Sequence, residues 1–303
     1  MSGLKAQLRR KLYECGRDPL SLFLLGCVVT AALTTFLVLS FLLAYILWQG
    51  LPNIEVSLFA LHYNSENVSL FPALIDTVLM VLMALAIATP LGIFAAVYLV
   101  EYAGRGNRLV GVVRVTADTL AGIPSIVYGL FGMLFFVTYL KWGYSLLAGA
   151  CTVAIMILPL IMRTTEEALK AIPDSFREGS YGLGAGKLRT VFAVVLPSAV
   201  PGILAGIILA IGRIVGETAA LIYTSGTVAA LPDGVLSSGR TLAVHMYVLA
   251  SEGLYMKQAY ATAVILVVIV IAINALSGRS ANPRKALPQL FIFIVFQHTH
   301  INF

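Results

Sequence analysis

The sequence consists of long apolar runs separated by short polar segments. About 20 apolar residues are needed to cross a hydrocarbon core of roughly 30 Å, so the pattern predicts about six membrane-spanning helices. These are Leu20–Trp48, Ile75–Val100, Ile123–Leu140, Ser145–Met162, Ser198–Tyr223 and Tyr260–Leu276. The first run is longer than the apolar part of a signal peptide and is interpreted as a retained span. The expected fold class is therefore an all-α polytopic membrane protein.

Proline and glycine interrupt several of these runs. Pro90 lies inside the second run, where an ordinary kink and a cavity-lining break both fit. Gly122-Ile-Pro124-Ser125 opens the third run. It is interpreted as a cavity-lining break, because a membrane tolerates irregular backbone only where protein or water satisfies it. The fifth run contains Gly202, Gly206 and Gly212, which favour close packing at a subunit or bundle interface.

Composition supports a membrane protein and argues against other classes. Hydrophobic residues make up 59% of the 303 residues and charged residues 11%, whereas soluble domains carry roughly 25% charged residues. A soluble enzyme and a disordered chain are both disfavoured. The three cysteines are scattered and the four histidines lie far apart, so no metal site, cofactor or disulfide framework is expected.

The lysines and arginines predict the orientation in the membrane, since cytoplasmic loops carry an excess of them. Five precede the first run, three follow the second and five follow the fourth, whereas the connections on the other side carry three in total. Thirteen against three predicts that both termini are cytoplasmic. The positive charge is not gathered on one solvated face, so nucleic-acid binding is not expected.

The fifth run contains two charged residues, Arg213 and Glu217. On one continuous helix these residues, four positions apart, share a face and lie within pairing distance. Ionisable groups at membrane depth cost at least about 2.5 kcal/mol each and usually mark a transport pathway, although a structural pair locking the helix to a neighbour also fits. Asp76 is another candidate pathway charge, for which a helix-start position at the membrane interface is the favoured interpretation.

The chemistry of this pair suggests an oxyanion. A guanidinium is suited to oxyanions, phosphate above all. A carboxylate beside it could accept a hydrogen bond from an anion that still carries a proton. Hydrogen phosphate carries one at pH 7 and sulfate does not, so Arg213 and Glu217 together predict selectivity for phosphate.

The connection between the fourth and fifth runs predicts a docking element. Ile172-Pro173 breaks the continuation of the fourth helix into the cytoplasm. Asp174 or Ser175 can then cap a short second helix, which the glycines at 182, 184 and 186 end. A short helix between two breaks suits binding of a partner, and a solvated loop helix is the alternative.

The same connection does not form a P-loop. Before Gly186-Lys187, Tyr181 stands where that motif requires glycine, and Leu188 replaces the required Ser or Thr. The chain is therefore expected not to be an enzyme, and ATP hydrolysis is expected to belong to a partner subunit.

The connection resembles the EAA signature of ABC importer permeases, which is Glu-Ala-Ala, three residues, Gly, nine residues and Ile-x-Leu-Pro. Here Glu178, Gly184 and Pro197 stand at the matching spacing. Gly179 and Ser180 replace the two alanines, so this helix is expected to be less stable by roughly 1–2 kcal/mol.

Further motifs narrow the resemblance. They are Gly122–Gly132, Arg163-Thr-Thr-Glu-Glu and Arg213–Ala219. Together they resemble the A-type permease subunits of bacterial phosphate importers, over about residues 20–278. The resemblance implies the type I fold of ABC importer transmembrane domains, a place in the bacterial inner membrane, and ATP-driven phosphate import.

The resemblance also implies partners and site residues. The partners are a homologous C-type permease, a dimer of cytoplasmic ATPase subunits and an extracytoplasmic phosphate-binding protein. Arg213, Glu217 and Thr218 are the expected substrate-pathway residues. Glu178, Gly184 and Pro197 are the residues expected to couple the chain to the ATPase.

The expected organisation is a cytoplasmic tail at 1–19, a transmembrane domain at 20–278 with its coupling region at about 163–197, and a tail at 279–303. The last segment does not fit the family pattern, and no function is assigned to it. Either an interfacial extension or a shifted reading frame explains it.

Three alternatives to phosphate import are compared. An ABC permease for another oxyanion, such as phosphonate, molybdate or sulfate, would share the Arg213 and Glu217 pair. A secondary anion carrier or channel would keep this pair but has no use for the EAA-like signature. An intramembrane hydrolase is disfavoured, because no serine or cysteine lies near a histidine within the spans.

Overall fold

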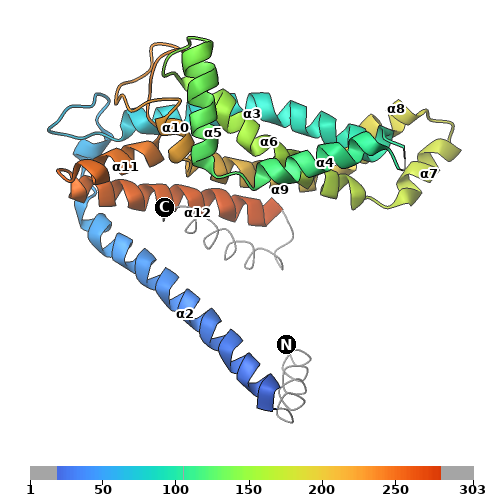
Figure 1. The fold of residues 1–303 in the computed structure, drawn as a ribbon, viewed down its shortest axis with the longest axis horizontal. Coiled ribbons are helices and arrows are strands. Elements are labelled where there is room, and N and C mark those ends of the chain that lie inside the picture. The colour runs from blue at the N-terminus through green and yellow to red at the C-terminus, as the bar shows by residue number, and fades with distance from the viewer. Residues whose placement is uncertain (1–18, 105, 281–303) are drawn as a thin grey trace. The chain divides into compact units, whose positions relative to one another are not determined.

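The computed structural model describes residues 19–104 and 106–280, and every regular element in these ranges is helical (Figure 1). The helices are α2 (Pro19–Gly50), α3 (Phe71–Val97), α4 (Arg108–Ala121), α5 (Ser125–Gly132), α6 (Leu146–Lys170), α7 (Asp174–Gly182), α8 (Lys187–Thr190), α9 (Leu196–Val215), α10 (Ala219–Ile222), α11 (Leu242–Glu252) and α12 (Met256–Ser280). Short 3₁₀ or π turns are η1 (Leu51–Asn53), η2 (Val56–Phe59), η3 (Tyr98–Tyr102), η4 (Met133–Tyr139) and η5 (Val191–Val195). The basic tail at 1–18 and the unassigned segment at 281–303 lie outside the described residues.

The chain divides into two units, residues 1–48 and residues 49–303. The described part of the first unit is helix α2, an uncharged helix of 32 residues with the composition of a membrane span. Its length and composition agree with the membrane span expected at Leu20–Trp48. The second unit contains the remaining helices and the candidate site.

The lengths and hydropathies of the helices agree with the expected fold class of a polytopic membrane protein. Among the described residues, five helices are long and apolar enough to cross a bilayer. They cover Phe23–Asn53, Phe71–Tyr102, Leu146–Lys170, Lys187–Val215 and Met256–Ala275. A bent pair, Arg108–Ala121 with Ser125–Tyr139, raises the number to six if it is one span. The chain is thus an all-helical, multi-pass membrane protein.

The core of the second unit is formed by α3, α6 and α9, which pack against one another (Figure 1). Helix α6 is central, since 67% of its most apolar segment is buried. Met80 and Ala84 of α3, Ile157 of α6, and Ala210 and Ile214 of α9 belong to one buried cluster. Helix α12 packs against α9 and α11, and α5 packs against α6 and α10.

Glycines allow these central helices to approach closely. A Cβ atom at Gly206 of α9 would clash with the Thr164 side chain of α6, and one at Gly202 would clash with Ala168. A Cβ atom at Gly92 of α3 would likewise clash with Ile161 of α6. The expected close packing of the fifth run therefore occurs within the bundle, against α6.

The predicted backbone breaks have two outcomes. Gly122-Ile-Pro124 separates α4 from α5, and the chain bends there by 100°, so this break is confirmed. Pro90 instead lies inside α3, which continues from Phe71 to Val97 without interruption. Between η4 and α6, Lys141 at φ 56° and Gly143 at φ 68° turn the chain.

Helix α11 carries a buried histidine that predicts a pH effect. The His245 ring is fully buried and packs edge-on against Tyr63, at 6.2 Å between ring centroids. Burial, and secondarily the nearby Arg240 cation, lowers the pKa of His245 from 6.5 to about 3. With only 11 residues, α11 is too short to span a bilayer.

Acidification is therefore expected to destabilise this region. Between pH 6.5 and pH 3 the unfolded histidine binds a proton that the folded site excludes, so stability falls as pH falls through this window. We expect a loss of about 2 kcal/mol between pH 7 and pH 5. Thermal unfolding at both pH values measures it. His245→Leu should show a smaller difference between the two, and an equal difference in both proteins would contradict the assignment.

Candidate functional site

The two charged residues of the fifth run do not share one helix face. Helix α9 ends at Val215, and Gly216 follows as its C-terminal cap. Glu217 lies beyond this cap, and its Oε1 accepts a hydrogen bond of 3.0 Å from the backbone N–H of Ala220, at the start of α10. The prediction of one continuous helix from Ser198 to Tyr223 is therefore wrong at its C-terminal end, and Arg213 and Glu217 form no ion pair in the described structure.

Local chemistry explains this break. Glycines at 212 and 216 each disfavour helix by roughly 1 kcal/mol relative to alanine. The first N–H groups of a new helix lack backbone acceptors, and the buried Glu217 carboxylate satisfies one of them. Thr218 occupies the position before α10, and its hydroxyl donates to the Gly216 carbonyl at 3.4 Å.

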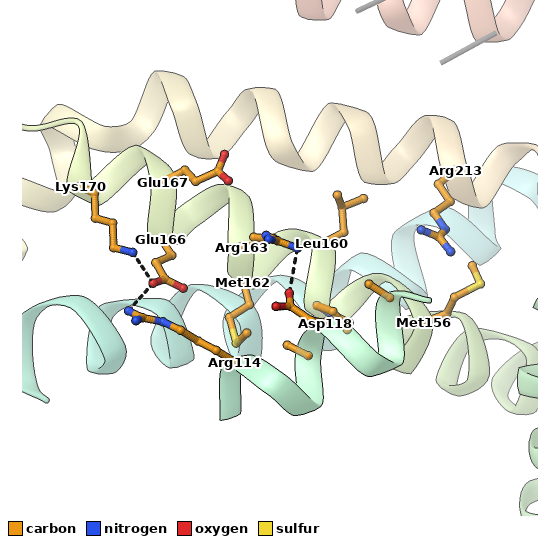
Figure 2. A pocket seen from close by; sticks show the side chains of 13 residues that line it. Arg114, Asp118, Met156, Leu160, Met162, Arg163, Glu166, Glu167, Lys170 and Arg213 are labelled. Atoms are coloured by element: carbon orange, nitrogen blue, oxygen red, sulfur yellow. Dashed lines mark hydrogen bonds and ion pairs between the residues drawn. The ribbon is translucent and has the colours of Figure 1, made fainter. Parts of the chain in front are cut away.

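Arg213 faces a polar pocket between α4, α6 and α9 (Figure 2). The pocket has a volume of about 340 Å³. Its lining includes four cationic and three acidic side chains: Arg114, Arg163, Lys170, Arg213, Asp118, Glu166 and Glu167. Figure 2 shows Arg213 and Lys170 toward opposite ends of this pocket, with the other charged residues between them.

Three of the four cations take part in ion pairs, formed with two carboxylates. The Glu166 Oε1 lies 2.5 Å from Nη2 of Arg114 and 2.6 Å from Nζ of Lys170. Its side chain is only 8% exposed, so one buried carboxylate serves two cations. Asp118 of α4 pairs with Arg163 of α6 at 2.8 Å. These contacts link α4 to α6 along the pocket.

Arg213 is the exception among the described residues that line the pocket. No carboxylate lies within ion-pair distance of its guanidinium, and none of the observed hydrogen bonds includes it. The side chain is half-buried at the end of α9. A guanidinium in this situation has its donors available for an oxyanion.

The region expected to couple to the ATPase forms a separate site. Glu178 lies exposed in the middle of α7. Gly184 has φ +81°, a conformation that favours glycine, and it ends the turn after α7. Pro197 begins α9 directly after the π turn η5; because proline has no N–H, it cannot extend the regular hydrogen-bond ladder backwards. The short helix predicted between two breaks is therefore present.

One of the two departures from the family alanines has a contact of its own. Ser180 of α7 shares a 2.8 Å hydrogen bond with the hydroxyl of Thr190 in α8. Gly179 has no such contact, and a Cβ atom there would meet nothing within 4 Å. Of the two replacements, only Gly179 lowers helix stability without a hydrogen bond that offsets the loss.

Gly179→Ala is accordingly expected to stabilise α7 by about 1 kcal/mol, because alanine loses less backbone entropy in a helix. Backbone hydrogen exchange of α7 in detergent should slow by about fivefold. Ser180→Ala is the comparison, and there the lost hydrogen bond should offset the gain in helix propensity. Faster exchange in Gly179→Ala would contradict this account.

Asp76 lies apart from the pocket. It is the sixth residue of α3 and is 1% exposed, so it is neither a helix-start residue nor a residue at an exposed surface. Its carboxylate packs against Gly239, where an added Cβ atom would clash with it. The next residue, Thr77, accepts a 2.8 Å hydrogen bond from the Leu242 N–H. This part of α3 anchors the loop that precedes α11.

Sequence reasoning did not predict most of the pocket. In the sequence, Arg114 and Arg163 contribute only to the count of lysines and arginines that predicts the orientation. Asp118 has no role predicted from the sequence. Glu166 appeared only within a family motif. A signal was available for α4, because Arg114 and Asp118 are four residues apart and share one face of that helix. Their partners on α6 could not be identified without the packing of the two helices.

The helical bundle and its charged pocket define a polytopic membrane protein of the ABC importer permease fold. Residues 88–282 match the family described as binding-protein-dependent transport system inner membrane component, and the chain belongs to this family. Solved structures share the fold. A bacterial alginate ABC transporter matches with a TM-score of 0.62 at 17% identity, over 85% of this chain and 94% of the other. An inward-facing MetNI methionine transporter gives 0.53 at 21% identity, over 69% and 91%.

Among proteins of known name, the chain is similar to PstA, the phosphate transport system permease protein. It is 45% identical to PstA of Yersinia pestis over 54% of each chain. It is 38% identical to PstA of Pasteurella multocida over 63% of this chain and 71% of the other. A probable ABC transporter permease of Bacillus subtilis, YqgI, is 35% identical over 57% of this chain and 63% of the other. The chain thus spans about half to two thirds of the length of several of these relatives.

Proposed function

We propose that this chain is a permease subunit of an ATP-driven importer of inorganic phosphate. The observation that carries the proposal is the unpaired Arg213 guanidinium facing a pocket whose other cations are paired. The similarity to PstA proteins supports phosphate as the substrate.

In this proposal Arg213 supplies the charge that attracts the anion. A planar guanidinium can donate two parallel hydrogen bonds to a phosphate. The three paired cations attract an anion less strongly, because Arg114 and Lys170 share the Glu166 carboxylate and Arg163 pairs with Asp118. A pathway with one free cation can bind the anion and still release it.

Glu217 and Thr218 complete the proposed pathway with roles that differ from those of a helical pair. One oxygen of Glu217 accepts from the Ala220 N–H, and the other has no hydrogen-bond donor among the described residues. Glu217 does not line the pocket, but its second oxygen can accept a hydrogen bond from a passing hydrogen phosphate, which sulfate, having no proton at pH 7, cannot donate. Thr218 holds the backbone turn that separates Arg213 from Glu217.

The proposed machine needs further subunits. The chain would form the pathway together with a homologous C-type permease and receive phosphate from an extracytoplasmic binding protein. Helix α7, with Glu178, Gly184 and Pro197 around it, would dock onto a dimer of ATPase subunits. Hydrolysis of ATP would take place in those partners.

The proposed location is the bacterial inner membrane with both termini in the cytoplasm. The excess of lysine and arginine in the tail before α2, in the connection after α3 and in the connection after α6 supports this orientation. Helix α7 would then lie on the cytoplasmic side, where ATPase subunits are found.

Transport by the assembled complex in lipid vesicles tests the proposal. We expect phosphate uptake that requires both ATP and the ATPase subunit. Arsenate, which also carries a proton at neutral pH, should compete, and sulfate should not. Uptake without the ATPase subunit would indicate a secondary carrier, and equal competition by sulfate would indicate a different oxyanion permease. Either result would overturn the proposal.

A further inference from the structure

One arginine of helix α7, Arg177, connects this helix to the helices that precede it in the chain. Arg177 extends from α7 to Glu101 in η3, at the end of α3, where Nη2 lies 2.7 Å from Oε1. Its Nε also contacts both Glu101 oxygens, at 3.1 and 3.4 Å. The two side chains are 15% and 5% exposed, so this forked pair is largely withdrawn from water.

The same guanidinium binds the C-terminal end of α6. Its Nη2 donates to the Leu169 carbonyl at 3.0 Å, and Nη1 donates to the Ile172 carbonyl at 2.9 Å. The last carbonyls of a helix have no partner within that helix and carry partial negative charge. One side chain therefore joins α7 to the ends of both α3 and α6.

The remaining contacts of α7 are few. No residue of α7 is buried, and Phe176, Glu178 and Tyr181 are all exposed. Its backbone packs mainly beside α8 and η5, which follow it in the chain. Since α7 has no apolar core of its own, Arg177 provides its main connection to the helices before it.

We propose that Arg177 is a positioning residue that transmits displacement of α7 directly to α3 and α6. This inference rests on the proposed function, in which α7 docks onto the ATPase. Helix α6 lines the pocket that Arg213 faces, and α3 packs against α6. Without Arg177, a movement of α7 would reach α6 through the turn at Ala171–Pro173 and indirectly through η5, whose Val191 and Val195 share a buried cluster with Leu169 of α6.

The test must separate transmission of movement from folding. Removing Arg177 alone would leave the buried Glu101 carboxylate without its partner, which is strongly destabilising. Replacing both residues with apolar ones of similar size is often tolerated. The informative protein is therefore the double variant Glu101→Leu with Arg177→Met. Arg108→Met is the matched control, because Arg108 is exposed, lies outside the coupling region and has no observed contact.

Phosphate uptake and ATP hydrolysis are measured together in vesicles that contain the complete complex. We expect the double variant to assemble and to hydrolyse ATP at half the wild-type rate or more. The phosphate transported per ATP should fall at least fivefold, whereas Arg108→Met should keep the wild-type ratio. An unchanged ratio, or a parallel loss of both activities in proportion to the assembled complex, would overturn the proposal.

A second measurement does not depend on phosphate. Spin labels are placed at the exposed Leu183, after α7, and at the exposed Tyr98, at the end of α3. The labels are attached in a background without the three cysteines. The distance distribution in the assembled complex should be narrow with Arg177 and broad in the double variant. Equal distributions would refute the proposed connection, whereas absence of phosphate uptake by the wild-type complex would refute the proposed function instead.

Discussion

Arg213→Gln is expected to reduce ATP-driven phosphate uptake by at least about 100-fold. Glutamine keeps the length and polarity of the side chain but removes the charge and the fork of donors. Losing a charged hydrogen-bonding group at a half-buried anion site costs roughly 3 kcal/mol, which corresponds to this factor. Uptake of labelled phosphate by vesicles that contain the assembled complex measures the effect.

Two further variants show whether the loss of uptake in Arg213→Gln is specific to the charge and shape of this side chain. Arg108→Gln removes an exposed arginine at the start of α4 that does not line the pocket, and it should leave uptake within twofold of wild type. Arg213→Lys keeps the charge without the planar fork and should retain intermediate uptake. Wild-type uptake by Arg213→Gln would show that the anion does not depend on this residue.

Gly206→Val is expected to destabilise the bundle by about 3 kcal/mol or more. The added carbons would clash with Thr164, whose hydroxyl already donates to carbonyl oxygens of α6 at 3.0 and 3.2 Å. Helices α6 and α9 would have to separate, and both carry residues of the pocket. Thermal unfolding of the purified protein measures the loss.

The same substitution at an open position provides the control. Gly111 lies in α4, and a Cβ atom there would meet nothing within 4 Å. Gly111→Val should therefore change stability by less than about 0.5 kcal/mol. Because valine is a better helix former than glycine, equal losses of stability in both variants would show that the clash with Thr164 does not account for the effect at Gly206.

Much of the fold could be predicted because a membrane span is a local property. The lengths of the apolar runs correspond to α2, α3, α6, α9 and α12, and the Gly122-Ile-Pro124 break was visible in the sequence. The prediction from local sequence was wrong at the end of α9, where the helix boundary depends on hydrogen bonds that the apolar pattern does not show. Around Gly216 the apolar pattern continues, yet a glycine and a capping carboxylate end the helix.

The candidate site was predicted only in part, because most of its contacts join different helices. Arg213 stood out as a charge in an apolar run, and the structure places it at a pocket. The pairing of Arg114 with Glu166 and of Asp118 with Arg163 depends on how α4 lies against α6. The Arg177–Glu101 contact likewise joins residues 76 positions apart.

By itself, the sequence determined the class of this protein, since hydrophobic length and low charge require a membrane, and since the spacing from Glu178 to Pro197 marks a permease. Only the tertiary structure decided which charges are neutralised and which remain available. Ion pairs form between side chains that folding brings within about 3 Å, and no pattern along one helix specifies its neighbour. Arg213 is distinguished from the other pocket cations by that packing alone.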